Sequence, residues 1–445
     1  MTGPSSALLT DFYQLSMAQA YFELGMQQAA TFELFVRRLP TSRGFLVFAG
    51  AEQAIELAER FRFAPAELDY LSGLGRFSRR FLRYLEELRF SGSIAAMAEG
   101  TIFFGEEPVV RVSAPIIEAQ LLETRLMNIC HFQTLIASKA ARCVIAAGGR
   151  ELVDFGLRRA HEADAGVFAA RAAFIAGFGA TANVEAGRRF GIPLSGTMAH
   201  SFIQAHDQEE DAFRNFLSVS EAPTAVLVDT YDTARGVERA MCAARRLESG
   251  GRARRLAAVR IDSGDLAAQA RLTRSQLDRG GFGDVKIILS GGLDECQIED
   301  LMRAGVPVDA FGVGTALDTS ADAPSLDMAY KLQSYAGKPR RKRSAGKATW
   351  PGIKQVYRQQ DELGPRDYVA LEGECESGTA LVVPRIDHGR RLAPLPALSE
   401  IRDHCRRELA ALPASMRALH VTDPARVEIS AGIRALAQRL DAAEP

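Results

Sequence analysis

Two hydrophobic periods occur side by side in the first 125 residues. Some segments repeat apolar side chains at the spacing of an amphipathic helix, and others alternate apolar and polar residues as a half-buried strand does. Because both patterns are present, we expect residues 1–125 to form a mixed α+β domain. The expected helices are residues 7–24, 51–60, 66–88 and 116–141, and the expected strands are residues 31–38, 93–98 and 108–113.

A different rhythm begins near residue 150. Short apolar runs end in small or polar residues, and a helical stretch follows, which is typical of a parallel α/β architecture. The polar residues collect just after the runs, where (β/α) barrels build their active sites. We therefore expect an irregular α/β barrel of about seven parallel strands over residues 126–325, with an open doubly wound sheet as the alternative. The expected strands are residues 151–155, 173–177, 192–194, 225–228, 257–261, 285–289 and 310–313.

The pattern changes again after Tyr330. Residues 369–383 offer two short strands around a glycine-rich turn, and residues 399–412 and 424–440 show amphipathic helical spacing. We expect residues 326–445 to form a C-terminal segment of short strands and helices that packs back on the N-terminal domain.

Composition narrows the class of protein. The 445 residues carry 54 Lys+Arg against 55 Asp+Glu, so a nucleic-acid coat or a membrane-surface binder is not indicated. A basic run at residues 338–343 is the local exception. No apolar stretch reaches the ~18 residues of a membrane-spanning helix, and the first residues lack the basic and apolar regions of a secretory signal. Six scattered cysteines without a C-x-x-C pair fit a reducing compartment, so we expect a cytoplasmic enzyme.

Two glycine loops follow neighbouring late strands. Residues 290–292 read Ser-Gly-Gly, and residues 311–315 read Phe-Gly-Val-Gly-Thr. Glycines let backbone N–H groups converge on an anion, and barrel enzymes often bind phosphate at this pair of loops. The alternative is that the glycines only permit tight turns. A P-loop is not indicated, because its lysine-containing pattern is absent. The phosphate candidates are Ser290, Gly291, Gly292, Gly312, Gly314 and Thr315.

Charged side chains follow three other expected strands. Arg260, Asp262 and Asp265 lie at the end of residues 257–261, and the two carboxylates could hold Mg²⁺ through water or bind sugar hydroxyls. The alternative is an N-capping aspartate with a local ion pair. His200 is a candidate acid, base or phospho-acceptor, unless it is a hydrogen-bonded structural histidine. Arg158 belongs to an arginine pair that suits an anionic substrate. Together these residues predict a site for a phosphorylated small molecule and a divalent cation.

The order of these segments resembles nicotinate phosphoribosyltransferases. The resemblance starts at residues 10–14, continues through residues 155–160, 196–202 and 228–232, and extends past residues 259–266 to 311–315 and 330–354. It implies a type II phosphoribosyltransferase fold, an irregular barrel beside a smaller mixed domain, in a head-to-tail homodimer with shared active sites. It also implies the reaction of nicotinate with 5-phosphoribosyl 1-diphosphate, which gives nicotinate mononucleotide and diphosphate, the first step of NAD salvage from nicotinate. ATP hydrolysis to ADP and phosphate, with Mg²⁺, would assist through a phosphohistidine.

The resemblance also implies roles for individual residues. His200 matches the phosphorylated histidine, and Asp262 and Asp265 match an acidic pair near the ribose and Mg²⁺. Tyr13, from the partner chain, stacks on nicotinate. The remaining matches are Thr197 and Arg260 for nicotinate, Arg158 at the ring end of the site, and Thr315 for the phosphoribosyl diphosphate.

Three other functions agree less well with the sequence. A relative that prefers nicotinamide or uses quinolinate would differ in how it reads the ring substituent, and Arg260 favours an acid. A non-catalytic nucleotide-binding descendant would not require the histidine, the aspartate pair and the second glycine loop together. Nucleic acid would need more basic surface than the run at residues 338–343 supplies.

Overall fold

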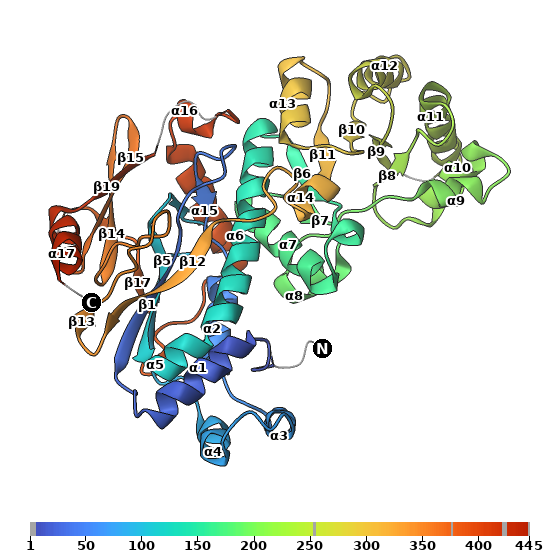
Figure 1. Ribbon diagram of the computed structural model, residues 1–445. Helices are drawn as coiled ribbons and strands as arrows, with labels where there is room; N and C mark the ends of the chain where they lie inside the picture. The colour runs from blue at the N-terminus through green and yellow to red at the C-terminus, as the bar shows by residue number, and fades with distance from the viewer. Residues whose placement is uncertain (1–5, 252–254, 375–376, 421–424, 444–445) are drawn as a thin grey trace. The chain divides into compact units, whose positions relative to one another are not determined.

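The chain leaves one folding unit at Lys139 and returns to it at Ser325. In the computed structural model, which describes residues 6–251, 255–374, 377–420 and 425–443, unit 1 comprises Met1–Ser138 with Ser325–Pro445 (Figure 1). Unit 2 comprises Lys139–Pro324. The sequence pattern had placed these divisions at residues 125 and 325.

An antiparallel sheet organises unit 1. Its strand β1 (Ala29–Val36) pairs with β5 (Pro108–Pro115) on one side and with β12 (Met328–Tyr335) on the other. Phe32 stacks on Tyr330 at 4.9 Å, so residues from both ends of the sequence share this core. The predicted strands at 31–38, 93–98 and 108–113 are confirmed. The other strands of this sheet are β3 (Ser93–Ala96), β13 (Lys338–Pro339), β17 (Val383–Asp387) and β18 (Arg390–Arg391).

Helices and small sheets complete unit 1. The four helical segments expected in its first part are confirmed, but residues 66–88 and 116–141 each contain two helices instead of one. The helices are α1 (Phe12–Glu23), α2 (Ala51–Glu59), α3 (Pro65–Gly73), α4 (Arg79–Glu87), α5 (Ile116–Leu121), α6 (Glu123–Ala146, which runs on into unit 2), α15 (Leu398–Ala411), α16 (Ala414–Arg417) and α17 (Ala431–Ala442). The remaining strands are β2 (Leu46–Val47), β4 (Ile102–Phe103), β14 (Lys354–Asp361), β15 (Gly364–Leu371), β16 (Thr379–Ala380) and β19 (Arg426–Ile429).

One C-terminal prediction is wrong in part. A helix was expected over residues 424–440, but β19 pairs in parallel with β15 and the helix begins only at Ala431. Pro424 lies outside the described residues. Pairing with a distant strand overrode the local helical pattern.

Unit 2 holds a parallel sheet that follows the order of a partly open barrel. Its six strands in the described residues run in the order β7-β6-β11-β10-β9-β8, so the chain order is preserved around the sheet and the opening lies between β7 and β8. The α/β class and the parallel sheet are confirmed, whereas the irregular barrel of about seven strands is not. The strands are β6 (Glu151–Asp154), β7 (Ala180–Thr181), β8 (Thr224–Leu227), β9 (Leu256–Ile261), β10 (Lys286–Leu289) and β11 (Ala310–Val313).

Two of the seven expected strands do not form. Residues 173–177 lie at the end of helix α7 (Ala163–Ala176), which is buried almost all round from Gly166 onward and therefore shows no polar stripe. Short apolar runs of this kind cannot be told from strands by periodicity alone. Residues 192–194 contribute a single bridge, from Leu194 to Thr181 in β7.

The helices that follow β8, β9 and β10 begin at side-chain caps. Asp232, Asp265 and Asp294 accept hydrogen bonds from the first turns of α11 (Thr233–Ser249), α12 (Leu266–Arg279) and α13 (Glu295–Arg303), which lie side by side in Figure 1. The remaining helices are η1 (Leu157–Arg159), α8 (Val184–Phe190), α9 (His200–Gln204), α10 (Glu209–Val219) and α14 (Thr315–Asp318).

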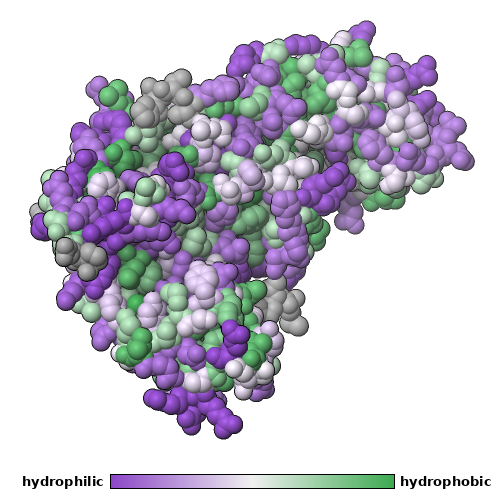
Figure 2. Space-filling view, viewed as in Figure 1, coloured by the Kyte–Doolittle hydropathy of each residue, from purple (hydrophilic) through white to green (hydrophobic). Residues whose placement is uncertain are grey.

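The surface is mixed in character. On the face seen in Figure 2, hydrophilic and hydrophobic residues are interspersed. None of the helices in the described ranges is long and apolar enough to cross a membrane.

Candidate functional site

The carboxyl ends of four adjacent strands supply the candidate site. Strands β6, β11, β10 and β9 are neighbours in the sheet and run in parallel, so the residues at their carboxyl ends gather at one edge. Phe155 follows β6, Gly314 follows β11, and Ser290 follows β10. Arg260 is the penultimate residue of β9.

Arg260 is held by contacts along its length. Its Nε donates to Ser290 Oγ at 2.8 Å, and one terminal nitrogen donates to Asp262 Oδ1 at 2.6 Å. The other terminal nitrogen lies 3.5 Å from Thr197 Oγ1. The guanidinium also lies over the Phe155 ring, 5.0 Å from its centroid, in a cation–π contact. The Arg260 guanidinium is thus fixed in place. Its terminal nitrogen nearest Thr197 makes only one long contact.

Asp262 is kept ionised by its neighbours. Partial burial acts to raise the pKa of Asp262, but the hydrogen bond from Ser290 and the charge of Arg260 outweigh burial, and the net pKa is lowered. The backbone N–H of Asp262 donates to Asp229 Oδ2 at 2.9 Å, and Ser263 Oγ donates to the same oxygen at 2.6 Å. Asp229 therefore fixes the loop that carries Asp262.

Glycine is required at two places in these loops. Gly291 has φ +93°, and a Cβ there would lie 1.8 Å from the carbonyl oxygen of Asp262. A Cβ on Gly312 would lie 2.4 Å from the Phe155 ring. The first glycine loop thus packs on the Asp262 backbone, and the second supports the ring beneath Arg260.

His200 begins helix α9 at a short distance from the β8 loop. Its Nδ1 lies 3.1 Å from Thr230 Oγ1, which leaves Nε2 as the ring nitrogen available for chemistry. The imidazole is partly exposed. The charge of His200 also helps to lower the pKa of Asp262, which links it electrostatically to the Arg260 cluster.

A buried carboxyl pair lies at the β6 and β11 ends. Asp154 accepts from Gly156 N–H at 2.8 Å and from Thr181 Oγ1 at 2.7 Å. Burial and the charge of Asp154 raise the pKa of Asp318 well above its usual range. When ionised, neither Asp318 oxygen has a hydrogen-bond donor among the described residues. The pair is therefore stabilised by one shared proton.

Comparison with known proteins shows which family this chain belongs to. The family model described as nicotinate phosphoribosyltransferase (NAPRTase) N-terminal domain matches residues 8–131, and the NAPRTase family model matches residues 150–339. The nicotinate phosphoribosyltransferase pncB2 of Mycobacterium tuberculosis is 48% identical over 418 residues, which cover 94% of this chain and 89% of that protein. The chain belongs to the nicotinate phosphoribosyltransferase family.

Another relative and two solved structures are similar to most of this chain. The nicotinate phosphoribosyltransferase of Bacillus subtilis is 45% identical over 381 residues, covering 83% of this chain and 77% of that protein. The crystal structure of human nicotinic acid phosphoribosyltransferase superposes with a TM-score of 0.86 at 27% identity and covers 97% of this chain and 99% of its own. The nicotinate-nucleotide pyrophosphorylase of Pyrococcus furiosus superposes with a TM-score of 0.74 at 27% identity and covers 91% and 95%.

The structure groups some of the predicted site residues and separates others. Thr197, Arg260, Asp262 and Ser290 form one hydrogen-bonded cluster. Asp265 instead caps helix α12 by accepting from Ala268 N–H at 3.0 Å, as the alternative interpretation of this aspartate expected. Three further predicted residues lie outside that cluster. Arg158 is exposed in η1, and Thr315 is exposed at the start of α14. Tyr13 of α1 is half exposed and belongs to unit 1.

Three supporting residues were not among the predicted site residues. Phe155, Asp229 and Thr230 contact Arg260, the Asp262 loop and His200 respectively. Each lies at the end of an expected strand or within two residues after it, which is the signal that could have identified them in a fold of this class.

The carboxylates offer few direct ligands for a metal. Among the described residues no group of three His, Cys, Asp or Glu side chains could hold an ion. However, Asp229 Oδ1 is buried without a hydrogen-bond partner in the described part of the chain. Mg²⁺ usually takes one or two carboxylates and completes its shell with water and substrate phosphates, so this sparse donor set fits that cation.

Proposed function

We propose that this chain transfers the 5-phosphoribosyl group from 5-phosphoribosyl 1-diphosphate to nicotinate and releases diphosphate. The observation that carries the proposal is Arg260, which is fixed over Phe155 at the strand ends with part of its fork free. A rigid guanidinium of this kind suits a carboxylate on a flat ring, because it can donate two parallel hydrogen bonds. In this role the enzyme would catalyse the first step of NAD salvage from nicotinate.

The ring would be bound by Arg260 together with Thr197. Thr197 Oγ1 lies beside the less occupied edge of the guanidinium, so its hydroxyl would share the nicotinate carboxylate. The Phe155 ring supports Arg260 from below and fixes its plane. We propose that Tyr13 reaches this ring from the partner chain of a homodimer, which agrees with its half-exposed position near the start of α1.

The phosphate groups would be bound by the two glycine loops. Gly291 and Gly292 both have positive φ, a backbone conformation in which successive N–H groups can converge on an anion. Gly314 and the exposed Thr315 extend this edge at the β11 end, and Arg158 would add a cation. Ser290 is committed to Arg260 and Asp262, so its role is to support the loop.

Mg²⁺, when bound, would neutralise negative charge on the diphosphate leaving group. Asp262 and Asp265 would hold it, in part through water, with Asp229 beside them. Asp262 is suited to this role because its lowered pKa keeps it ionised. Asp265 can contribute only an oxygen that its capping bond leaves free.

The chemistry requires positioning more than proton transfer. The bond between ribose C1 and the diphosphate oxygen breaks with its electron pair on oxygen, and the pyridine nitrogen forms the new bond to C1. Since that nitrogen already carries a lone pair, no strong general base is needed. The fixed Arg260 fork and the glycine loops would hold the two reactants in line.

ATP would act through His200. With Nδ1 held by Thr230, the imidazole Nε2 would accept the terminal phosphoryl group of ATP, giving ADP, and water would later release phosphate. A phosphorylated His200 would add negative charge near Asp262 and Arg260 and so couple ATP hydrolysis to the transfer equilibrium.

One assay tests the proposal. The purified protein is incubated with 5-phosphoribosyl 1-diphosphate and Mg²⁺, with nicotinate, nicotinamide or quinolinate, each with and without ATP. The proposal expects nicotinate mononucleotide from nicotinate, faster or more complete with ATP. Product from nicotinamide or quinolinate instead, or no mononucleotide from any ring, would refute it.

A further inference from the structure

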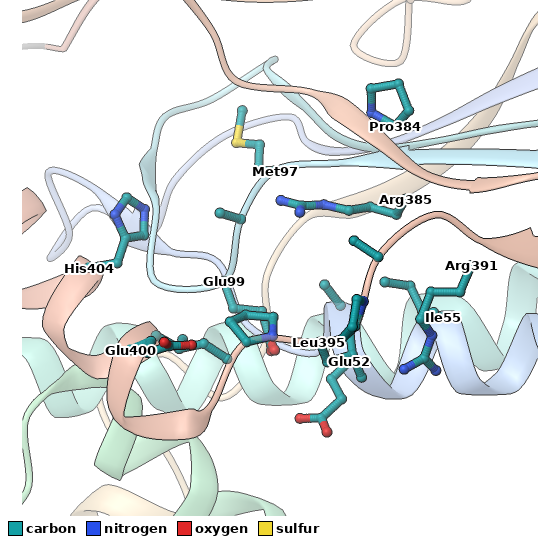
Figure 3. A pocket seen from close by; sticks show the side chains of 16 residues that line it. Glu52, Ile55, Met97, Glu99, Pro384, Arg385, Arg391, Leu395, Glu400 and His404 are labelled. Carbon is teal, nitrogen blue, oxygen red and sulfur yellow. The ribbon is translucent and has the colours of Figure 1, made fainter.

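Unit 1 contains a cavity of about 220 Å³ that the transfer reaction does not use. Its walls come from the start of α2, the loop after β3, and the segment from β17 to the first turns of α15 (Figure 3). Most of the lining is apolar, with Ile55, Met97, Leu395 and Ile401 among the contributors. None of these residues belongs to the unit that holds Arg260.

One charged group reaches into this apolar space without a hydrogen-bonded partner. Figure 3 shows the Arg385 side chain extending between Met97 and Glu99. Within the described residues no hydrogen bond or ion pair joins the Arg385 guanidinium to another group, although Glu99 lies near enough to act on it electrostatically. Burial lowers the pKa of Arg385, so its charge is only partly solvated. A half-buried guanidinium without a partner favours an anion.

The other polar side chains at this cavity already have partners. Glu99 accepts from Gly50 N–H, and Glu400 accepts from Ala397 N–H at 2.8 Å. His404 Nε2 lies 3.0 Å from Thr101 Oγ1, and Arg391 is paired with Glu59. Arg385 is thus the cation that a ligand could engage without breaking an existing contact.

We propose that this cavity is a second ligand site, which binds a small monocyclic carboxylate with its ring on the apolar wall and its carboxylate on Arg385. The volume supports a ligand of that size, since a dry cavity of about 150 Å³ is enough for benzene. The remaining space accommodates one carboxylate. Such a ligand would join α2, the β3 loop and the C-terminal segment, and would raise the melting temperature as its concentration exceeds the Kd.

Benzoate is the probe, and the full-length Arg260→Ala protein is the starting material, so that binding at the catalytic edge is weakened. Binding is measured by calorimetry and by the shift in melting temperature. Saturable binding is expected, with at least about tenfold loss of affinity on adding Arg385→Met, because charge-assisted hydrogen bonds are lost. Arg385→Met should fold normally, since Arg385 makes no hydrogen bond to lose.

Matched variants separate the possible outcomes. Arg391→Gln removes a second cation at the same cavity that is already paired, and should change benzoate affinity much less. Ala393→Phe adds a ring at the exposed rim and should block binding, which preserves the test if Arg385→Met fails to fold. No saturable binding, unchanged affinity in both Arg385→Met and Ala393→Phe, or acetate and phosphate binding as tightly as benzoate, would each overturn the proposal. None of these readouts depends on the transfer reaction.

Discussion

At the scale of single residues, Asp262 and the Asp154–Asp318 pair are held in opposite protonation states. Arg260 and Ser290 lower the pKa of Asp262 in spite of partial burial, so this carboxylate is ionised. Burial and the charge of Asp154 raise the pKa of Asp318, so the Asp154–Asp318 pair retains a proton. Environment therefore assigns different roles to side chains of the same type.

The protonated carboxyl makes stability depend on pH. Because the pKa of Asp318 is raised by folding, the folded state retains a proton that the unfolded chain releases, and stability falls as pH rises above about 4. The Asp318→Asn substitution removes this pH-dependent loss of folding stability. We expect the variant to be more stable than the parent at pH 7 by about 1 kcal/mol or more, since an asparagine does not have to take up a proton when the chain folds.

Thermal melts across pH 4 to 8 measure this effect. The advantage of Asp318→Asn should shrink toward pH 4, and the exposed Asp300→Asn should stay within about 0.5 kcal/mol of the parent. An Asp318→Asn protein that is less stable at every pH would mean that Asp318 is ionised and paired in the folded protein.

His200 carries the second prediction at this scale. His200→Ala should abolish the stimulation by ATP and the acid-labile phosphoprotein, while slow ATP-independent transfer survives on the glycine loops and Arg260. His206→Ala is the matched control, because His206 bonds its own helix through Phe202 O and lies away from Thr230 in sequence. ATP stimulation that persists in His200→Ala would exclude the histidine as phospho-acceptor.

At the scale of elements, the glycine loop after β10 is more constrained than its sequence suggests. Gly291→Ala would place a Cβ 1.8 Å from Asp262 O, whereas Gly292→Ala meets no atom within 4 Å. Both positions have positive φ, which costs an alanine roughly 1–2 kcal/mol. We expect Gly291→Ala to lose binding of 5-phosphoribosyl 1-diphosphate and more stability than Gly292→Ala, as measured by calorimetry and thermal melts.

The comparison between Gly291→Ala and Gly292→Ala shows whether the loss of binding and stability comes from backbone strain or from the contact with Asp262. Equal losses would mean that backbone strain alone matters, and that the loop does not depend on its close approach to Asp262.

Sequence periodicity predicted much of the element order because most strands of unit 2 are short apolar runs that end in polar residues. It failed at residues 173–177, where α7 is buried on nearly all sides and shows no helical stripe. It also failed at β19, where pairing with β15 decides the structure. The cluster at Arg260, Asp262 and Ser290 could be predicted because each lies at the carboxyl end of a strand. The capping of α12 by Asp265 depends on side-chain geometry that spacing leaves open.

At the scale of the whole molecule, the predicted site residues fall in two units of the chain. Tyr13 belongs to unit 1, and Arg260 and His200 belong to unit 2. If Tyr13 completes the site of a partner chain, a mixed dimer of Tyr13→Ala and His200→Ala chains has one site with both defects and one with neither. The isolated heterodimer should therefore recover roughly half of the ATP-stimulated activity of the parent dimer.

Differently tagged chains, co-expressed and purified in tandem, provide that heterodimer. Activity no higher than the mean of the two mutant homodimers would show that Tyr13 acts within its own chain or not at all.

The central claim is that Arg260 recognises the carboxylate of nicotinate. The ratio of kcat/KM for nicotinate to kcat/KM for nicotinamide tests this claim most directly. The fixed fork should contribute roughly 1.5–3 kcal/mol to the charged ring, as hydrogen bonds to charged groups do. Arg260→Ala should therefore lower that ratio by at least about tenfold, mainly through a higher KM for nicotinate. An equal loss of kcat/KM for both rings would contradict the account, because Arg260 would then support the site without recognising the acid.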